Sequence, residues 1–404
     1  MKYIVVLCDG MADEPLEELG GRTPLEAART VNMDSLAKVS EIGMVRTVPE
    51  GMAPGSDTAN LSVIGYDPKE YYTGRSPLEA LSIGADMALD DVSFRCNLVT
   101  LSEEEERYED RHILDHSSGE ISTEEAAELL SALSEGVKRE GYTFYVGTSY
   151  RHLLIQKNGK VTELTAPHDI LTKRIGEYLP EDGVLREMMV KSYDILKDHP
   201  VNKRRRTEGK NPANSAWFWG AGTRPALRSF EEKNGVKGAM ISAVDLLKGI
   251  AVGAGMDNIV VEGANGGLDT NYAGKAQAAV KALTEDGYDF VYVHIEAPDE
   301  MGHQGSFQDK ITAIERIDEQ IIGPVRTALE DAGTDFRMLI LPDHPTPVRV
   351  RTHTSDPIPY LLYDSTEYIA GMDTYSEKTG KQTGVFVEKG YRLMDHLLEK
   401  DTEQ

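Results

Sequence analysis

The stretch "YIVVLC" (residues 3–8), followed at once by Asp9 and Gly10, decides the fold class of this chain. It is a short, continuous apolar run rich in β-branched residues, which is typical of a parallel strand covered on both faces. One lysine precedes it, and an acidic residue follows it where a signal peptide would have a small-residue cleavage site. The run therefore predicts a first buried strand and not a secretory signal.

Two similar apolar runs lie late in the chain, "DFVYVHIEA" (289–297) and "FRMLILPDH" (336–344). Between them, residues 308–333 have apolar side chains at helical spacing, with Pro324 as the expected kink. A strand, a helix and a second strand in this order predict a right-handed crossover in a parallel sheet. The expected fold is therefore α/β, with helices on both faces of the sheet in a three-layer α/β/α domain.

Helix starts and changes in composition suggest how the chain is divided. "TPLE" (23–26), "SPLE" (76–79) and "STEE" (122–125) each place a hydroxyl residue three positions before a glutamate, which predicts a capping box. The composition changes near residues 89–93 and again within the polar stretch 198–214. We therefore expect a discontinuous α/β domain (1–89 and 233–404) that is interrupted by a smaller inserted α+β domain (90–232).

Composition narrows the choice of partner and compartment. The 404 residues carry a formal net charge of −25, which disfavours nucleic acid and anionic membranes as partners. No apolar run approaches the roughly 18 residues that a membrane helix needs. Two cysteines form no disulfide framework and no CxxC site, as is typical of a cytoplasmic protein. One basic run, "NKRRR" (202–206), is interpreted as a solvated loop in preference to a patch that attracts an anionic substrate.

Acidic and imidazole side chains follow the predicted strands at the places where chemistry gathers in an α/β sheet. Taken singly, each would be a turn or helix-capping residue. Together they would be costly at one edge of a sheet unless cations neutralise them, and mixed carboxylate and imidazole ligands suit zinc, manganese or iron better than calcium. The six residues are Asp9, Asp299, His303, Asp343, His344 and His353.

Six ligands are about right for two metal ions, which together can clamp the attacking and leaving oxygens of a phosphoryl transfer. "APGSDTAN" (53–60) has one serine, Ser56, in a turn rich in glycine and proline, with no lysine or arginine for a phosphate-binding loop. A metal-bound serine hydroxyl can act as a nucleophile at neutral pH, which would explain this serine.

A set of motifs spread over the whole chain resembles the alkaline phosphatase superfamily, and within it the archaeal type of cofactor-independent phosphoglycerate mutase. The motifs include "LCDGMAD", "PGSDTANLSVIGYDP", "PDEMGH", "LPDHPTP" and "RTHTSDPIP". The resemblance implies an alkaline-phosphatase-like domain and one metal held by Asp299, His303 and His353. It implies a second metal held by Asp9, Ser56, Asp343 and His344. Mn²⁺ is the implied ion, with Mg²⁺, Zn²⁺ or Co²⁺ as alternatives and no need for bisphosphoglycerate.

The same resemblance implies that Ser56 takes the phosphoryl group of 3-phosphoglycerate and returns it to the 2-hydroxyl of the retained glycerate. The substrate contacts that it implies are Arg151, His152, Lys248, Asp115 and Arg224, with Asp245 beside Lys248. One position departs from the family pattern, because Glu120 stands where the motif after Asp115 has a histidine.

Three other interpretations use the same residues. A metal-dependent phosphomonoesterase would pass the phosphoryl group to water, and another phosphomutase of the superfamily would differ mainly in the insert. A non-enzymatic scaffold is disfavoured because all seven expected positions carry competent residues. The sequence thus predicts an enzyme that acts on a small molecule and does not specify its oligomeric state.

Overall fold

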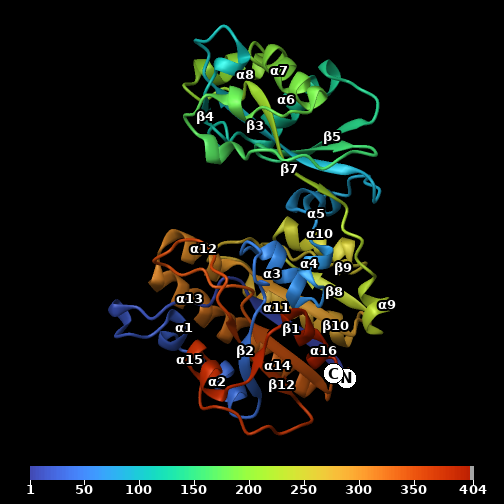
Figure 1. Cartoon of the computed structure of the whole chain (residues 1–404). Coiled ribbons are helices and arrows are strands. Elements are labelled where there is room, and N and C mark those ends of the chain that lie inside the picture. Colours follow the sequence, from blue (N-terminus) through green and yellow to red (C-terminus); the bar gives the residue numbers. More distant parts are fainter. Residues whose placement is uncertain (401–404) are drawn as a thin grey trace. The chain divides into compact units, whose positions relative to one another are not determined.

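The computed structural model describes residues 1–400 and divides the chain into two compact units (Figure 1). The first unit combines residues 1–72 with the chain from Leu227 onward, and the second is Thr73–Ala226. In the described part of the chain, no helix has both the length and the apolar character needed to cross a membrane.

The first unit is built on an eight-stranded sheet with the spatial order β13-β2-β12-β11-β1-β10-β8-β9. The four central strands β11, β1, β10 and β8 are parallel, whereas β12 runs antiparallel to both β11 and β2. The strands of this sheet are β1 (Lys2–Cys8), β2 (Glu41–Val45), β8 (Gly238–Ile241), β9 (Asp257–Asn258), β10 (Phe290–Ile295), β11 (Phe336–Leu341), β12 (Ile358–Asp364) and β13 (Phe386–Val387).

Helices cover both faces of this sheet, so the expected three-layer α/β/α arrangement is confirmed. On one face, apolar side chains of α2, α11, α13 and α14 pack on alternate residues of β1 and β10, such as Ile4, Val6 and Val291. On the other face, α10 contacts β8 and α16 contacts β11. The helices are α1 (Pro24–Ala27), α2 (Val31–Ala37), α3 (Ser56–Val63), α4 (Pro68–Tyr71), α9 (Phe230–Asn234), α10 (Asp245–Gly253), α11 (Tyr272–Thr284), α12 (Ala297–Gln304), α13 (Phe307–Ile317), α14 (Gly323–Asp331), α15 (Glu377–Thr383) and α16 (Leu393–Leu397).

The predicted crossover joins β10 to β11 through α12, α13 and α14. A π-helical segment, Asp318–Ile322, separates α13 from α14, and Pro324 lies in the first turn of α14. Proline has no backbone N–H to continue the α-helical hydrogen-bond pattern. The helix is therefore interrupted just before Pro324, the residue at which a kink was expected. The Asp318 carboxylate accepts hydrogen bonds from the backbone N–H groups of Asn32 and Met33, which ties this interruption to the start of α2.

The second unit has a five-stranded antiparallel sheet with helices packed against it. Its core contains Trp217, Phe218 and Phe94 together with apolar residues of the two longest helices. The strands are β3 (Val92–Leu101), β4 (Ile113–Asp115), β5 (Tyr142–Thr148), β6 (Arg151–Gln156) and β7 (Ser215–Thr223), and the helices are α5 (Arg75–Ser82), α6 (Thr123–Gly136), α7 (Gly183–Leu196) and α8 (Pro200–Thr207).

The unit boundaries differ from the expected residues 89/90 and 232/233. Helix α5 belongs to the second unit because the Ser76 hydroxyl is bonded to Ser93 of β3 and Glu79 pairs with Arg95 of the same strand. Helix α9 belongs to the first unit, where Phe230 packs against Phe290 of β10 with their ring centroids 4.7 Å apart. Such packing partners cannot be read from composition, which only located the polar stretches near the boundaries.

The three capping predictions had different outcomes. Thr23 and Glu26 form the complete box at α1, and Ser122 accepts a hydrogen bond from the Glu125 N–H at α6. The prediction for Ser76 was wrong, because α5 begins at Arg75 and the Ser76 hydroxyl is used by β3. A buried partner in another element therefore replaced the local cap.

The basic run also proved to be structural. Residues 202–206 lie in α8, and the guanidinium of buried Arg205 donates to the Ser118 carbonyl at 2.6 Å and to Glu125 at 2.5 Å. Arg206 pairs with Glu103. The expectation of a solvated loop was wrong because the run is helical and Arg205 is buried against Glu125, although Lys203 and Arg204 remain exposed.

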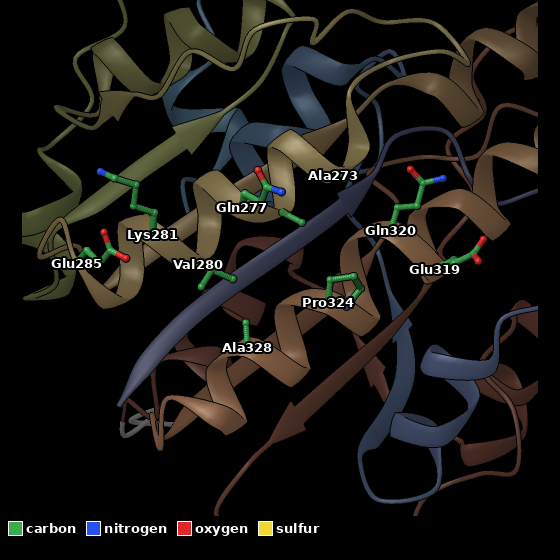
Figure 2. Close-up of a pocket in the computed structure, with 10 residues that line it drawn as sticks. Ala273, Gln277, Val280, Lys281, Glu285, Glu319, Gln320, Pro324 and Ala328 are labelled. Carbon is green, nitrogen blue, oxygen red and sulfur yellow. The ribbon is translucent and has the colours of Figure 1, made fainter.

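A groove of about 640 Å³ lies between α11 and α14 (Figure 2). Ala276 and Val280 line it from α11, and Pro324 and Ala328 line it from α14. None of the residues predicted to carry the chemistry lines this groove, so its size does not mark the candidate site.

Candidate active site

The seven residues predicted to form the metal and serine site lie close together in the first unit. Asp9 follows β1, Asp343 and His344 follow β11, and Asp299 lies on α12 just after β10. Because β11, β1 and β10 are adjacent and parallel, their carboxyl ends meet at one edge of the sheet. The remaining three are Ser56, at the first position of α3, His303 of α12, and His353 in the loop between β11 and β12.

One group of side chains surrounds His344. Its Nε2 atom lies 3.3 Å from Asp343 Oδ2 and 3.7 Å from Asp9 Oδ1. The backbone N–H groups of Gly10 and His344 donate to Asp343 Oδ1, at 3.1 and 2.9 Å. All three side chains are almost completely buried. This group therefore consists of two carboxylates and one imidazole that are shielded from bulk water.

A second group surrounds Asp299. Its Oδ2 lies 3.2 Å from His303 Nε2, one helical turn further along α12, and its Oδ1 lies 3.4 Å from His353 Nε2. The two imidazoles face each other with their Nε2 atoms 3.1 Å apart. The His353 ring also lies over His344, with the ring centroids 4.1 Å apart. The two groups are therefore continuous.

Ser56 lies where α3 begins and contacts the first group directly. Its Oγ is 3.1 Å from His344 Nε2. Asn60, one turn along α3, donates from Nδ2 to the Ser56 carbonyl and to Asp343 Oδ2, both at 2.8 Å. The Asn60 Oδ1 atom accepts a 2.6 Å hydrogen bond from the Tyr292 hydroxyl. The start of α3, and with it the serine hydroxyl, is thus tied to the carboxylate after β11.

The titration behaviour of this cluster follows from burial and from like charges. Burial, with the nearby carboxylates of Asp343 and Asp299, raises the pKa of Asp9 well above its usual range. A hydrogen bond with Asp299 raises the pKa of His303 to about 9. Burial instead lowers the pKa of His344. Without cations, the cluster can therefore relieve its charge only by taking up protons.

The donor set fits divalent cations. Two sets of three ligand atoms lie within 4.8 Å of one another, Asp9 with Asp343 and His344, and Asp299 with His344 and His353. His344 belongs to both sets, and His303 contacts the second through Asp299 and His353. Within residues 1–400, Asp9 Oδ1 is a buried oxygen without a hydrogen-bond partner, which is the state expected of an oxygen reserved for a cation.

Sequence reasoning missed His294, although it stood within a quoted strand. It lies on β10, is completely buried, and its Nε2 is 2.8 Å from Asp9 Oδ2. Burial lowers its pKa to about 3, so the ring is neutral. An imidazole inside an apolar run was the available signal, because such a ring needs polar partners in the core.

The predicted substrate contacts in the second unit fall into two kinds. Arg151 is exposed at the start of β6, with its guanidinium 5.1 Å from the centre of the Tyr150 ring. His152 is buried, accepts a hydrogen bond from the Gly147 N–H at 3.1 Å, and has its pKa lowered to about 4 by burial. Its neutral ring organises the β5–β6 hairpin, whereas Arg151 presents an accessible cation.

The other predicted contacts are engaged locally. Asp115 accepts hydrogen bonds from the N–H groups of Ser117 and Gly119 and from the Asn211 amide. Arg224 donates to the Met87 carbonyl at 2.9 Å. Lys248 of α10, in the first unit, pairs with Asp245 at 3.2 Å, the partner that the sequence suggested.

A cluster of aromatic, imidazole and guanidinium groups in the second unit was not anticipated. The Arg95 guanidinium lies 4.4 Å from the centre of the Trp219 ring, and His168 packs against the same ring with centroids 5.2 Å apart. His116 contacts both His168 and Tyr150. These residues come from distant segments of the sequence, so no local pattern marked them.

Fold and site together define a class of protein, an α/β enzyme whose serine, carboxylates and imidazoles meet at the carboxyl edge of a parallel sheet. Two related proteins are each 50% identical to this chain, a probable 2,3-bisphosphoglycerate-independent phosphoglycerate mutase of Geobacter sulfurreducens and a 2,3-bisphosphoglycerate-independent phosphoglycerate mutase of Methanosarcina acetivorans. The alignments cover 99% and 98% of this chain and 100% of each relative. The family model for 2,3-bisphosphoglycerate-independent phosphoglycerate mutase matches residues 37–202.

Solved structures agree with these relationships. A protein from Pyrococcus horikoshii superposes with a TM-score of 0.82 at 32% identity, over 100% of this chain and 98% of that one. The cofactor-independent phosphoglycerate mutase of Thermoplasma acidophilum superposes with a TM-score of 0.69 at 28% identity, over 99% of both chains. The chain belongs to the family of 2,3-bisphosphoglycerate-independent phosphoglycerate mutases, as its motifs predicted.

Proposed function

We propose that this chain interconverts 3-phosphoglycerate and 2-phosphoglycerate through a phosphoserine at Ser56, with two divalent cations and without added bisphosphoglycerate. Family membership supports the reaction. The observation that carries the mechanism is the serine hydroxyl at the start of α3, 3.1 Å from the imidazole at the centre of the acidic cluster. A hydroxyl in that position is accessible to a phosphoryl group and close to ligands for a cation.

The ligands assigned to the cations are the side chains at the sheet edge. His344 and Asp343 serve one ion together with Asp9 and Ser56, and Asp299 serves the other together with His303 and His353. Mn²⁺ is the ion that we assign, because the family resemblance implies it, and the mixed carboxylate and imidazole donors are compatible with it as they are with zinc or iron. When bound, the ions supply positive charge to the phosphoryl oxygens and favour the deprotonated serine.

The residues of the chain perform a double displacement. The Ser56 hydroxyl loses its proton, and Oγ attacks the phosphorus of 3-phosphoglycerate while the bond from phosphorus to the 3-oxygen breaks. The 3-oxygen takes a proton. The 2-hydroxyl of the retained glycerate then loses its proton as its oxygen attacks the phosphoserine, the bond from Oγ to phosphorus breaks, and Ser56 Oγ takes up a proton, so that no net proton is gained or lost. Asn60 keeps the start of α3 in place through both steps.

We assign the positively charged side chains of Arg151 and Lys248 to substrate binding. Arg151 is the guanidinium group suited to a carboxylate or phosphate, because it is exposed and presents a planar fork of donors. Lys248 is assigned to the phosphoryl group, with Asp245 holding its ammonium. Asp115, His152 and Arg224 are assigned to shaping the second unit through the hydrogen bonds that they already make. Two buried cysteines without a disulfide support a cytoplasmic location.

A coupled assay tests the proposal against a phosphatase. Protein is freed of metal, reconstituted with Mn²⁺, and given 3-phosphoglycerate alone. We expect 2-phosphoglycerate as the main product and inorganic phosphate as a minor one. Chief release of inorganic phosphate would instead identify a phosphomonoesterase, and absence of both products would show that the substrate assignment is wrong.

Acidification is expected to weaken metal binding and with it the activity. In the metal-free chain, Asp299 raises the pKa of His303 to about 9, so this imidazole is protonated below that pH and must lose its proton to bind a cation. The apparent affinity for Mn²⁺ should therefore fall as the pH is lowered from about 9 through 6.5. Mn²⁺ titrations across this range measure it, and an affinity that stays constant would contradict His303 as a ligand.

A further inference from the structure

Among the described residues, only one of the two carboxylate oxygens of Asp9 has a hydrogen-bond partner. His294 lies on β10 next to β1, in register with Leu7, and both the imidazole and the carboxylate are buried. The His294 Nε2 atom is 2.8 Å from Asp9 Oδ2. The other oxygen, Oδ1, has no hydrogen-bond partner among the described residues and points toward His344, whose Nε2 is 3.7 Å away. The two oxygens of one carboxylate therefore have different surroundings.

The hydrogen bonds behind His294 set the direction of this contact. The Val244 N–H donates to Ser242 Oγ at 3.0 Å, and Ser242 Oγ is 3.1 Å from His294 Nδ1. The serine hydroxyl has a single proton, and with one lone pair engaged by Val244 that proton is free to point at Nδ1. The ring proton then sits on Nε2 and is donated to Asp9 Oδ2. Asp9 must be ionised to bind a cation, and in that state the opposite tautomer would place a bare nitrogen lone pair against a carboxylate oxygen.

The backbone of His294 is anchored as well. The buried Lys275 ammonium donates to the His294 carbonyl at 2.8 Å. A buried histidine that only filled space would need polar partners for its own nitrogens and nothing more. Here the series of hydrogen bonds runs from the Val244 N–H through Ser242 and His294 to the carboxylate of Asp9. The second oxygen of that carboxylate has no hydrogen-bond partner among the described residues.

We propose that His294 is a positioning residue that holds Asp9 through Oδ2 and so leaves Oδ1 as its single ligand oxygen for the cation shared with Asp343 and His344. This inference rests on the proposed two-cation site and adds a residue to it. Partners that orient a ligand typically change metal affinity 10- to 100-fold when they are removed. His294 should therefore influence the cation without touching it.

Two amide substitutions separate this role from packing. The Nε2 of glutamine can occupy the place of the imidazole Nε2, so His294→Gln keeps a donor for Asp9. The side chain of asparagine extends only to the position of the imidazole Nδ1. His294→Asn therefore keeps the contact with Ser242 and loses the hydrogen-bond donor to Asp9. Tyr360→Phe is the matched control, because it removes a partly buried 2.6 Å hydrogen bond from Tyr360 of β12 to Glu41 of β2. Strand β11 lies between β12 and β1, so this bond is remote from Asp9.

Each metal-free variant is titrated with Mn²⁺ by calorimetry, and its thermal unfolding is recorded. We expect two bound ions in the wild type, and in His294→Asn one of them about 10- to 100-fold weaker. His294→Gln should stay within a few-fold of wild type, and Tyr360→Phe should match it. At saturating Mn²⁺, His294→Asn should recover its kcat, so that the defect appears as a raised Mn²⁺ requirement.

The outcomes distinguish the two proposals. If the wild type binds no Mn²⁺, the proposed function itself is wrong. If the wild type binds two ions and His294→Asn binds both equally well, or if His294→Gln is weakened as much as His294→Asn, only the role of His294 is refuted. Should His294→Asn fail to fold, His294→Phe supplies the same comparison, because it keeps a ring in the core and also lacks the donor.

Discussion

Ser56→Ala is expected to lower mutase turnover by at least about 10⁴-fold, which is the scale of loss when a serine enzyme loses its nucleophile. Two other hydroxyls bonded to this cluster are already engaged, because Thr346 donates to Asp299 and Thr47 donates to the Asp343 carbonyl, so neither is expected to replace Ser56 as acceptor. The Ser56 hydroxyl makes its hydrogen bond to His344, so its removal should leave the fold intact and at least one cation bound. The coupled assay measures the turnover, and Mn²⁺ titration measures the binding.

The same prediction can be checked in the wild type. A phosphoserine should be trappable at Ser56 by rapid acid quenching and found there by mass spectrometry. Labelled glycerate in solution should not enter the product, because the intermediate retains its own glycerate. Ser35→Ala is the control, since Ser35 lies on α2 and its exposed hydroxyl donates to the Asn32 carbonyl and accepts from Arg326. Near-normal mutase activity in Ser56→Ala would refute the phosphoserine mechanism.

Exhaustive chelation should have the second largest effect and reduce turnover to background. Asp9, Asp299 and Asp343 are buried together, and burial with like charge already raises the pKa of Asp9. Cations relieve this repulsion, so Mn²⁺ should also stabilise the fold, by about 2.7 kcal/mol per site at a hundred times its Kd. Activity and the thermal unfolding temperature are measured after dialysis against chelator and again after Mn²⁺ is restored.

Asp299→Asn is the matched variant for this experiment. It removes one charge from the second ligand group and keeps nearly the same shape, so it should raise the Mn²⁺ concentration needed for activity. The chelated wild type should regain activity at lower Mn²⁺ than this variant. Full activity after exhaustive chelation would contradict a two-cation site.

The residues at the sheet edge were predictable because the carboxyl ends of adjacent parallel strands lie at the same edge of a sheet. "YIVVLC", "FVYVHI" and "FRMLIL" each read as a buried strand, and each is followed by an aspartate within a few residues. The structure places these three strands side by side and parallel, so the aspartates had to meet. His303 followed from Asp299, because residues four apart lie on the same face of a helix.

Other parts of the site could not be read in this way. Ser56 begins a helix after β2, which is separated from β1 by two strands, and its position near His344 depends on the loop that carries it back. Its turn rich in glycine and proline singled out the serine and the motif resemblance gave it a role, but neither placed it beside His344. The two unit boundaries were misplaced because α5 and α9 are held by buried partners in distant segments.

The sequence by itself determined the class of fold, the strands, and the residue types at their carboxyl ends, because these depend on periodicity and on the residues next in the chain. Only the tertiary structure decided that His344 is shared by both ligand groups and that His294 holds one oxygen of Asp9 and leaves the other free. It also decided that Arg205, within the basic run 202–206, is buried and bonded to Ser118 and Glu125. The physical reason is that a hydrogen bond or an ion pair is defined by distance and direction between atoms of different elements, and neither is encoded by spacing along the chain.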